Sequence, residues 1–207
     1  MRQGGAIRSG LSFSPGMRVG LYGGSFDPPH AGHAHVARTA LRRLNLDRVV
    51  WLVSPQNPLK AAPPANGWSS RLLHVEHHAW GPSMLVSDFE GRVAARYTIE
   101  TIRALKFRFR GVHFVWIMGA DGLAAFHRWR DWTSIMREIP IAVVARPHVG
   151  LKSRFSPAAR RFARARRPLS AASRLAVARP PAWVYLDAPL SGASSTAIRA
   201  GRRSSVI

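Results

Sequence analysis

Residues 18–33 have the sequence RVGLYGGSFDPPHAGH and give the clearest indication of the fold class. Its first part, Arg18–Tyr22, is a short apolar run that ends at Gly23 and Gly24, which is typical of a buried strand followed by a tight turn. Beyond the turn, apolar residues recur every three or four positions and predict an amphipathic helix: Val36, Ala37, Ala40, Leu41 and Leu44. A strand that leads through a glycine turn into a helix is typical of a parallel α/β sheet.

The same alternation continues along the chain. Further apolar runs predict strands at residues 49–53, 84–87, 112–118, 141–145 and 183–186. Helical patterns lie between them, at 71–80, at 98–109, in a stretch that ends at 136, and from 195 to 200. We therefore predict an α/β fold, a doubly wound, mostly parallel sheet with helices on both faces. We expect residues 1–16 to form a flexible N-terminal tail and residues 17–207 to form a single domain.

The charge of the chain is strongly positive. Its 207 residues include 31 Lys and Arg against 10 Asp and Glu, which gives a formal net charge of +21. Such a balance indicates anionic partners, whether nucleic acid, acidic lipid or small phosphorylated molecules. Nine of the cations lie in Lys152–Arg179, which contains no acid and is rich in alanine. We predict that this segment forms an Arg-rich helical insertion at about residues 150–180.

Several classes of protein are excluded or disfavoured. The chain has no cysteine, so disulfides, cysteine zinc sites and thiol nucleophiles are excluded. We expect no membrane span, because no apolar run approaches the roughly 18 residues that a span needs. The first 16 residues lack the apolar stretch of a secretory signal, so we expect a cytoplasmic location. The histidines at 74, 77 and 78 do not match the HExxH pattern of a zinc helix.

Candidate binding residues follow the first and last predicted strands. In parallel sheets, ligands bind beyond the carboxyl ends of the strands. Gly23 and Gly24 allow close approach of a ligand, and the start of the next helix offers free N–H groups to a phosphate. His30 and His33, three residues apart, can point into the same anion site. After the last strand, hydroxyl residues at a helix start are followed one turn later by an arginine: Ser194, Ser195, Thr196 and Arg199.

These two segments resemble known signatures. The string from Gly23 to His33 fits GGxFDPxHxGH, the first signature of the nucleotidylyltransferase superfamily, and residues 194–199 are similar to the second, (I/V)SSTxIR, with Ala193 in place of Ile or Val. Segments at 54–60, 96–102, 118–129 and 143–147 extend the resemblance to bacterial nicotinate-nucleotide adenylyltransferases. Leu59 departs from that family by removing a third histidine, and His148 departs by replacing a glycine.

The resemblance spans Val19 to Arg199 and implies a Rossmann-like fold and an enzyme of NAD biosynthesis. The implied reaction transfers the adenylyl group of ATP to nicotinate mononucleotide and forms deamido-NAD and pyrophosphate. Mg²⁺ is expected to arrive with ATP, with no dedicated protein site. The implied catalytic residues are His30, His33 and Arg199. The implied ATP-binding residues are Gly23, Gly24, Ser25, Phe26, His30, His33, Gly119, Asp121, Ser194, Ser195, Thr196 and Arg199. The implied nicotinate-nucleotide-binding residues are Asp27, Lys60, Tyr97, Thr98, Trp129 and Arg146.

Other interpretations stay open at this point. Trp129 also suits a hydrophobic core, Asp121 also suits a helix cap, and Tyr97 with Thr98 also suits an ordinary helix start. Phosphopantetheine adenylyltransferases share both signatures, but they usually have Thr where His30 stands; they and the glycerol-phosphate cytidylyltransferases have shorter chains. A nucleic-acid-binding protein is the alternative from another class, and we do not expect it because no RNA-binding aromatic signature is present. The oligomeric state is not predicted.

Overall fold

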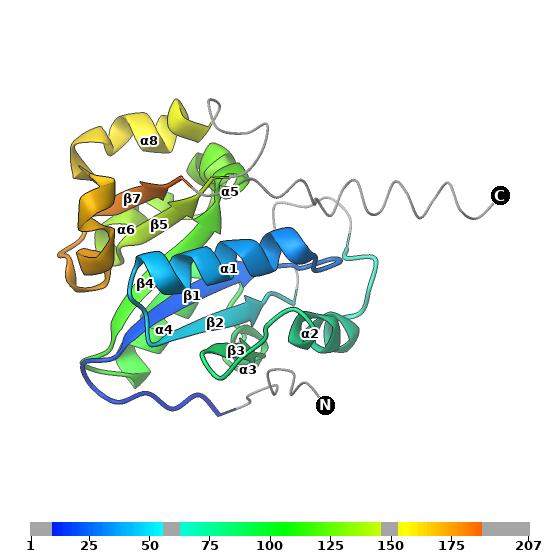
Figure 1. The fold of residues 1–207 in the computed structure, drawn as a ribbon. Helices are drawn as coiled ribbons and strands as arrows, with labels where there is room; N and C mark the ends of the chain where they lie inside the picture. Colours follow the sequence, from blue (N-terminus) through cyan, green and yellow to red (C-terminus); the bar gives the residue numbers. More distant parts are fainter. Residues whose placement is uncertain (1–9, 56–62, 146–152, 188–207) are drawn as a thin grey trace.

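The computed structural model describes residues 10–55, 63–145 and 153–187, and its centre is one sheet (Figure 1). The strand order is β3-β2-β1-β4-β5-β7-β6, and every neighbouring pair is parallel. The predicted Rossmann-like α/β fold is therefore confirmed. The strands are β1 Arg18–Gly24, β2 Arg48–Val53, β3 Met84–Ser87, β4 His113–Gly119, β5 Ile141–Val144, β6 Arg166–Arg167 and β7 Trp183–Leu186.

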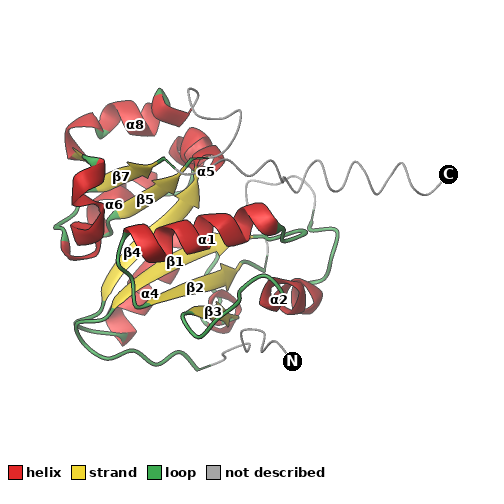
Figure 2. Cartoon of the chain, viewed as in Figure 1, coloured by secondary structure: helices red, strands yellow, loops and turns green. Residues whose placement is uncertain are grey.

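Helices cover both faces of this sheet (Figure 2). The α-helices are α1 Ala31–Arg43, α2 Trp68–Glu76, α3 Phe89–Arg92, α4 Thr98–Arg108, α5 Ala120–Ala125, α6 Trp132–Glu138 and α8 Pro157–Arg161. The 3-10 helices are η1 Phe126–Arg128, η2 Ala163–Ala165 and η3 Leu169–Val177. One core cluster lies under α1, α2 and η3, and a second lies under α3, α4, α5, α6 and α8.

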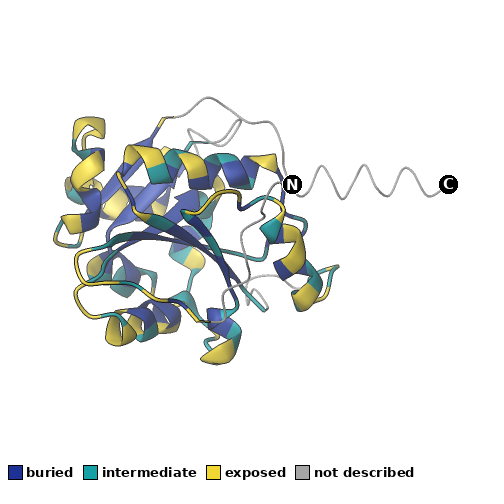
Figure 3. Cartoon of the chain, turned by 60° about the horizontal axis from the view of Figure 1, so that its bottom comes forward, coloured by how far each residue is buried: buried dark blue, intermediate teal, exposed yellow. Residues whose placement is uncertain are grey.

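Strand β2 shows why the strands are visible in the sequence as unbroken apolar runs. Val49, Trp51 and Val53 belong to the first core cluster, whereas Val50 and Leu52 belong to the second. All five are fully buried, and Figure 3 shows the same burial along the middle of the sheet. A parallel strand that is covered on both faces must be apolar at every position, because successive side chains point to opposite faces.

The structure differs from the sequence prediction in several regions, among them residues 120–138 and the described part of the Arg-rich segment. The stretch predicted as helical up to Met136 is divided into α5, η1 and α6, because Trp129 is extended and Asp131 has a left-handed backbone (φ 51°). The described part of the Arg-rich segment contains α8, η2 and η3, as well as the short strand β6, which the sequence does not predict. This strand extends the sheet by pairing with β7.

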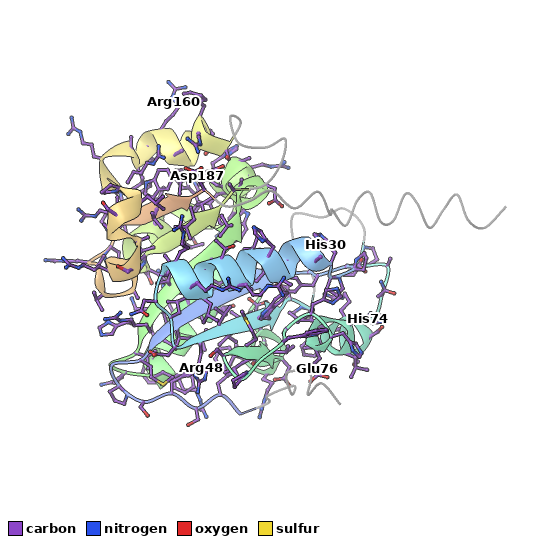
Figure 4. The ribbon with its side chains drawn as sticks, in the orientation of Figure 1. His30, Arg48, His74, Glu76, Arg160 and Asp187 are labelled. Carbon is purple, nitrogen blue, oxygen red and sulfur yellow. The ribbon has the colours of Figure 1, made fainter. Side chains whose placement is uncertain are left out.

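The Arg-rich segment is attached to the sheet edge partly through its own arginines. The Arg154 guanidinium lies 4.5 Å from the ring centre of Tyr185 on β7, and its Nη2 lies 2.5 Å from an Asp187 carboxylate oxygen. Arg166 lies over the ring of Trp183 at 5.5 Å. Other cations of the segment, such as Arg160 of α8, are exposed at the outer edge of the molecule (Figure 4). Within the described ranges, no helix is both long enough and apolar enough to cross a membrane.

Candidate active site

The candidate site lies where the carboxyl ends of β1 and β4 meet. Strand β1 ends at Gly24 and β4 ends at Gly119, and these two strands are neighbours in the sheet. On its other side β1 pairs with β2, so the chain winds outward in opposite directions from this point. Such a topological switch point is the usual ligand position in an open parallel sheet. The fold therefore brings the predicted residues after β1 and β4 to one edge.

The turn after β1 requires its glycines because aromatic rings pack directly against them. A Cβ atom at Gly23 would lie 2.4 Å from Cη2 of the buried Trp116. At Gly24, a Cβ atom would lie 3.0 Å from Cζ of Phe26. Phe26 itself has a positive φ of 45°, and its side chain folds back into the core with 2% exposure. The glycines thus make room for a sharp turn whose aromatic side chain points inward.

Phe26 supports the second histidine. Its ring packs edge-on against the ring of His33, with centroids 5.1 Å apart, and contacts Tyr22 and Trp51 at 5.3 and 5.2 Å. The sequence resemblance places Phe26 among the ATP-binding residues, and the structure places its side chain beneath the turn. Through this contact the Phe26 ring limits the positions that the His33 ring can take.

His30 and His33 together cap the start of α1. Figure 4 labels His30 at this end of the helix. Nδ1 of His30, the N-cap residue, accepts a hydrogen bond from the Gly32 backbone N–H at 3.1 Å. Nδ1 of His33 accepts one from the backbone N–H of His30 at 3.2 Å. This is a capping box in which imidazole nitrogens take the place of the usual hydroxyl and carboxylate. The three-residue spacing that the sequence shows thus has a structural role as well as a chemical one.

The capping bonds determine which ring nitrogen carries the proton. A nitrogen that accepts a backbone N–H bond cannot itself hold a proton, so each neutral ring has its N–H at Nε2. The two rings lie close together, with centroids 3.8 Å apart and an interplanar angle of 39°. The first turn of α1 contains no acidic residue that would offset the positive end of the helix. The start of α1 is therefore suited to an anion such as phosphate.

Asp27 joins the turn after β1 to the loop that precedes α2. Its Oδ2 accepts a hydrogen bond from the Ala65 backbone N–H at 2.8 Å, and its Oδ1 accepts one from Nδ2 of Asn66 at 2.7 Å. The side chain is only 4% exposed. The resemblance assigns Asp27 to the nicotinate nucleotide, and in the structure both of its carboxylate oxygens hold this loop.

Arg71 is a buried cation on α2 that the sequence reasoning missed. Its guanidinium donates to four backbone carbonyls: those of Ser25 and Ser54 from Nη1, Pro55 from Nη2 and Asn66 from Nε. Burial lowers the pKa of Arg71 below its ordinary value, and the nearby Asp27 carboxylate partly opposes that shift. The sequence contains one signal for it, since Arg71 lies four residues before the buried Val75 and thus on the inward face of α2.

Glu90 is a buried acid that the sequence reasoning also missed. Its Oε2 accepts a hydrogen bond from Oγ of Ser54 at 2.7 Å, and its Oε1 accepts one from Oγ1 of Thr101 on α4 at 3.1 Å. Desolvation raises the pKa of Glu90 above its ordinary value, although the two hydroxyl bonds act in the opposite direction. Glu90 lies in α3, a four-residue helix with no periodic pattern that could have indicated its burial.

Three residues predicted to bind the nicotinate nucleotide lie at helix ends: Tyr97 and Thr98 at the start of α4, and Trp129 at the end of η1. Tyr97 is the N-cap residue of α4 and Thr98 is its first residue, and both are half-buried. Trp129 is half-buried as well, and its ring meets the Trp116 ring edge-on at 6.2 Å. Because Trp116 also packs against Gly23, Trp129 is connected through one ring to the turn after β1.

Two of the remaining predicted residues, Gly119 and Asp121, lie within the described ranges, and the others lie outside them. Gly119 ends β4 and is the N-cap residue of α5, and Asp121 is exposed in the first turn of that helix. The structure contains no group of three or more His, Asp or Glu that could hold a metal ion within residues 10–55, 63–145 and 153–187. The predicted residues outside the described ranges are Lys60, Arg146, Ser194, Ser195, Thr196 and Arg199.

Comparisons with known proteins show which family the chain resembles. The model of the cytidylyltransferase-like family matches residues 21–201. A probable nicotinate-nucleotide adenylyltransferase of Caulobacter sp. (strain K31) is 62% identical over 183 residues, which cover 88% of this chain and 97% of the relative. A protein with the same description from Cereibacter sphaeroides (strain ATCC 17025 / ATH 2.4.3) is 56% identical over 187 residues, 90% of this chain and 99% of the relative.

Solved structures share the fold at much lower identity. The Plasmodium falciparum nicotinic acid mononucleotide adenylyltransferase complexed with NaAD matches with a TM-score of 0.64 and 14% identity, over 88% of this chain and 82% of that chain. The identity is too low to add more than the fold, but the family match and the two close relatives span nearly the whole chain. The chain therefore belongs to the cytidylyltransferase-like family and, within it, to the nicotinate-nucleotide adenylyltransferases.

Proposed function

We propose that this protein transfers the adenylyl group of ATP to nicotinate mononucleotide and produces deamido-NAD and pyrophosphate in NAD biosynthesis. The observation that carries the proposal is the pair of capping histidines at the start of α1, His30 and His33, at the switch point of the sheet. Two Nε2–H donors at a helix start suit the triphosphate of ATP. The relatives that are 62% and 56% identical support nicotinate mononucleotide as the acceptor. A cytoplasmic location is part of the proposal.

Adenylyl transfer requires that the two substrates are aligned and that the charge developing on the phosphates is stabilised. A phosphate oxygen of nicotinate mononucleotide forms a bond to the α-phosphorus of ATP, and the bond from that phosphorus to the bridging oxygen breaks, so that pyrophosphate leaves. The attacking phosphate is ionised near neutral pH, so no general base is needed. His33 would donate from Nε2 to the α-phosphate, where charge develops, and His30 would donate to the phosphates beside it. Neutral donors supply this stabilisation without losing their bonds to the helix start.

The other assignments belong to the same proposal. Ser194, Ser195, Thr196 and Arg199 would hold the β- and γ-phosphates, and Arg199 would stabilise the departing pyrophosphate as a planar cation. Mg²⁺ would enter with ATP and supply positive charge to the phosphates, because the acid of the turn after β1, Asp27, uses both oxygens to hold the loop before α2. Lys60, Arg146, Tyr97, Thr98 and Trp129 would hold the nicotinate nucleotide.

One assay tests the proposal against its nearest alternatives. Pyrophosphate release from ATP is measured with nicotinate mononucleotide, nicotinamide mononucleotide or phosphopantetheine as the acceptor. We expect turnover with nicotinate mononucleotide and a kcat/KM at least tenfold lower with nicotinamide mononucleotide, because a site that binds a carboxylate would leave its hydrogen-bond donors without a charged acceptor there. Turnover only with phosphopantetheine would contradict the proposal, and equal kcat/KM on both mononucleotides would contradict the nicotinate preference.

A second measurement tests the role of the histidines. The variant His33→Ala should lose more than tenfold in kcat while its circular dichroism spectrum stays that of the wild type. Nearly normal turnover by this variant would remove His33 from the α-phosphate. The variant Arg103→Met serves as the control, because Arg103 pairs with Glu138 between α4 and α6 on the exposed surface.

A further inference from the structure

We propose that Arg71 is a positioning residue that holds the turn after β1 and the loop after β2 in the one arrangement in which both substrates are aligned. The inference rests on the proposed function and deepens it, because it says what keeps the phosphate-binding turn in register with the other side of the site. As a positioning residue, Arg71 touches neither substrate. It acts through the backbone carbonyls that it holds.

The geometry of the guanidinium joins three chain segments at one point. Nη1 donates to the carbonyl of Ser25 at 2.7 Å and to that of Ser54 at 2.8 Å, which are 46 and 17 residues away from Arg71 in the sequence. Nη2 donates to the Pro55 carbonyl at 2.7 Å, and Nε to the Asn66 carbonyl at 3.1 Å. A single nitrogen atom thus connects the turn after β1 to the loop after β2.

These carbonyls lie just beyond the ends of two neighbouring strands. Strand β1 ends at Gly24 and β2 ends at Val53, so Ser25 and Ser54 are the first residues after the strands. Backbone carbonyls that are shielded from water are stabilised by a hydrogen-bond donor. The planar guanidinium can satisfy several carbonyls in fixed directions, whereas an ammonium group acts as a point charge. Arg71 is itself only 1% exposed, so its position is determined by these bonds.

Asp27 connects the turn after β1 to the loop before α2 through hydrogen bonds of its own. It lies two residues beyond Ser25 and holds the Ala65 N–H and the Asn66 side chain, while Arg71 holds the Asn66 carbonyl. The turn that leads to His30 is therefore connected to the loop before α2 by both the Asp27 carboxylate and the Arg71 guanidinium. A shift of the guanidinium would move the turn and this loop relative to each other.

The connection continues to α4 through Ser54. The Ser54 carbonyl accepts from Arg71, and its hydroxyl donates to Glu90, which accepts in turn from Thr101 on α4. The start of α4 carries Tyr97, which is proposed to hold the nicotinate nucleotide. Arg71 thus lies between the histidine side and the nucleotide side of the site. Loss of its bonds should disturb the alignment of two bound substrates more than the binding of either one.

The test compares Arg71→Met and Arg71→Lys with Val75→Ala. Val75 lies one turn further along α2 and is fully buried in the first core cluster, so its truncation lowers stability without removing a donor to the carbonyls. Steady-state pyrophosphate release is measured at a temperature at which all proteins are folded by circular dichroism. We expect both Arg71 variants to lose at least tenfold in kcat, with each KM changed less than threefold, because misalignment of bound substrates lowers kcat. Val75→Ala should keep kcat within twofold of the wild type.

Hydrogen exchange gives a readout that does not depend on activity. The amides of His30, Gly32, Ser54 and Ala65 report on the turn and the two loops, since each donates a bond that depends on their arrangement. In Arg71→Lys they should exchange at least tenfold faster than in Val75→Ala, while the Trp116 amide, which donates to Pro140, is unchanged relative to that control.

The outcomes separate this inference from the proposed function. If the wild type does not turn over nicotinate mononucleotide, the proposed function fails, and the exchange pattern alone decides the role of Arg71. If the wild type is active, a Lys variant with wild-type kcat and exchange overturns the inference. A Lys variant that fails to fold also overturns it, because Arg71 would then be a requirement of the fold. Equal kcat losses in Arg71→Lys and Val75→Ala would overturn it as well.

Discussion

Replacing His30 by Asn or by Ala separates its two roles, at the helix start and toward phosphate. The His30 ring accepts the Gly32 N–H and packs 3.8 Å from the His33 ring. Asn is among the best N-cap residues and can accept the same N–H bond, but it has no Nε2–H donor at that position. Ala removes both the capping bond and the donor. The pair of variants therefore differs mainly in the helix cap.

The expected losses of stability and of kcat follow from the contacts that each variant removes. Loss of the ring contact should lower the free energy of unfolding by about 1 kcal/mol in both variants. Loss of the cap adds about 1 kcal/mol for Ala, so His30→Ala should be about 2 kcal/mol less stable than the wild type. Loss of one preorganised donor to developing charge lowers kcat by about 100-fold to 1,000-fold, and this loss should be equal in Asn and Ala.

Two assays decide the matter. Urea unfolding followed by tryptophan fluorescence measures the free energy of unfolding, and pyrophosphate release from ATP with nicotinate mononucleotide measures kcat. If His30→Asn turns over at nearly the wild-type rate, Nε2 of His30 does not serve the phosphates. If the Ala variant is as stable as the Asn variant, the Gly32 bond does not stabilise α1 and does not fix the N–H of His30 at Nε2.

Three further changes test other parts of the structure. Gly23→Ala should lower the free energy of unfolding by about 1–3 kcal/mol in urea titrations, because the new Cβ would lie 2.4 Å from the buried Trp116 ring; wild-type stability would contradict the packing. Glu90→Gln should remove a pH dependence. Because burial raises the pKa of Glu90 above its ordinary value of 4.5, the folded wild type binds more protons than the unfolded chain, so its stability relative to the Gln variant should fall as the pH rises above about 4.5. A constant difference between pH 4 and 8 would show that Glu90 does not titrate differently on folding. Trp129→Ala should raise the KM for nicotinate mononucleotide more than that for ATP, and equal changes would indicate that Trp129 serves only the core around Trp116.

The strands were predictable because of how a doubly covered parallel sheet is built. Residues 49–53 are apolar at every position since each side chain enters one of the two core clusters. The predicted ends lie within two residues of the observed ends of β1, β2, β3, β4, β5 and β7. Strand β6 has only two residues, Arg166 and Arg167, both exposed, so no apolar run could indicate it. The break before α6 depends on the backbone of Asp131, which no periodic pattern shows.

The candidate site was likewise only partly predictable from the sequence. The glycine turn and the two histidines of α1 could be predicted from the sequence, because His30, Gly32 and His33 interact within a single helical turn, where spacing decides contact. The contacts of Arg71 and Glu90 depend on the folded chain, because their partners come from loops that the chain brings back after a strand or a helix. A local pattern records contacts between near neighbours. It does not record which backbone carbonyl, 46 residues away, an arginine will meet when the sheet forms.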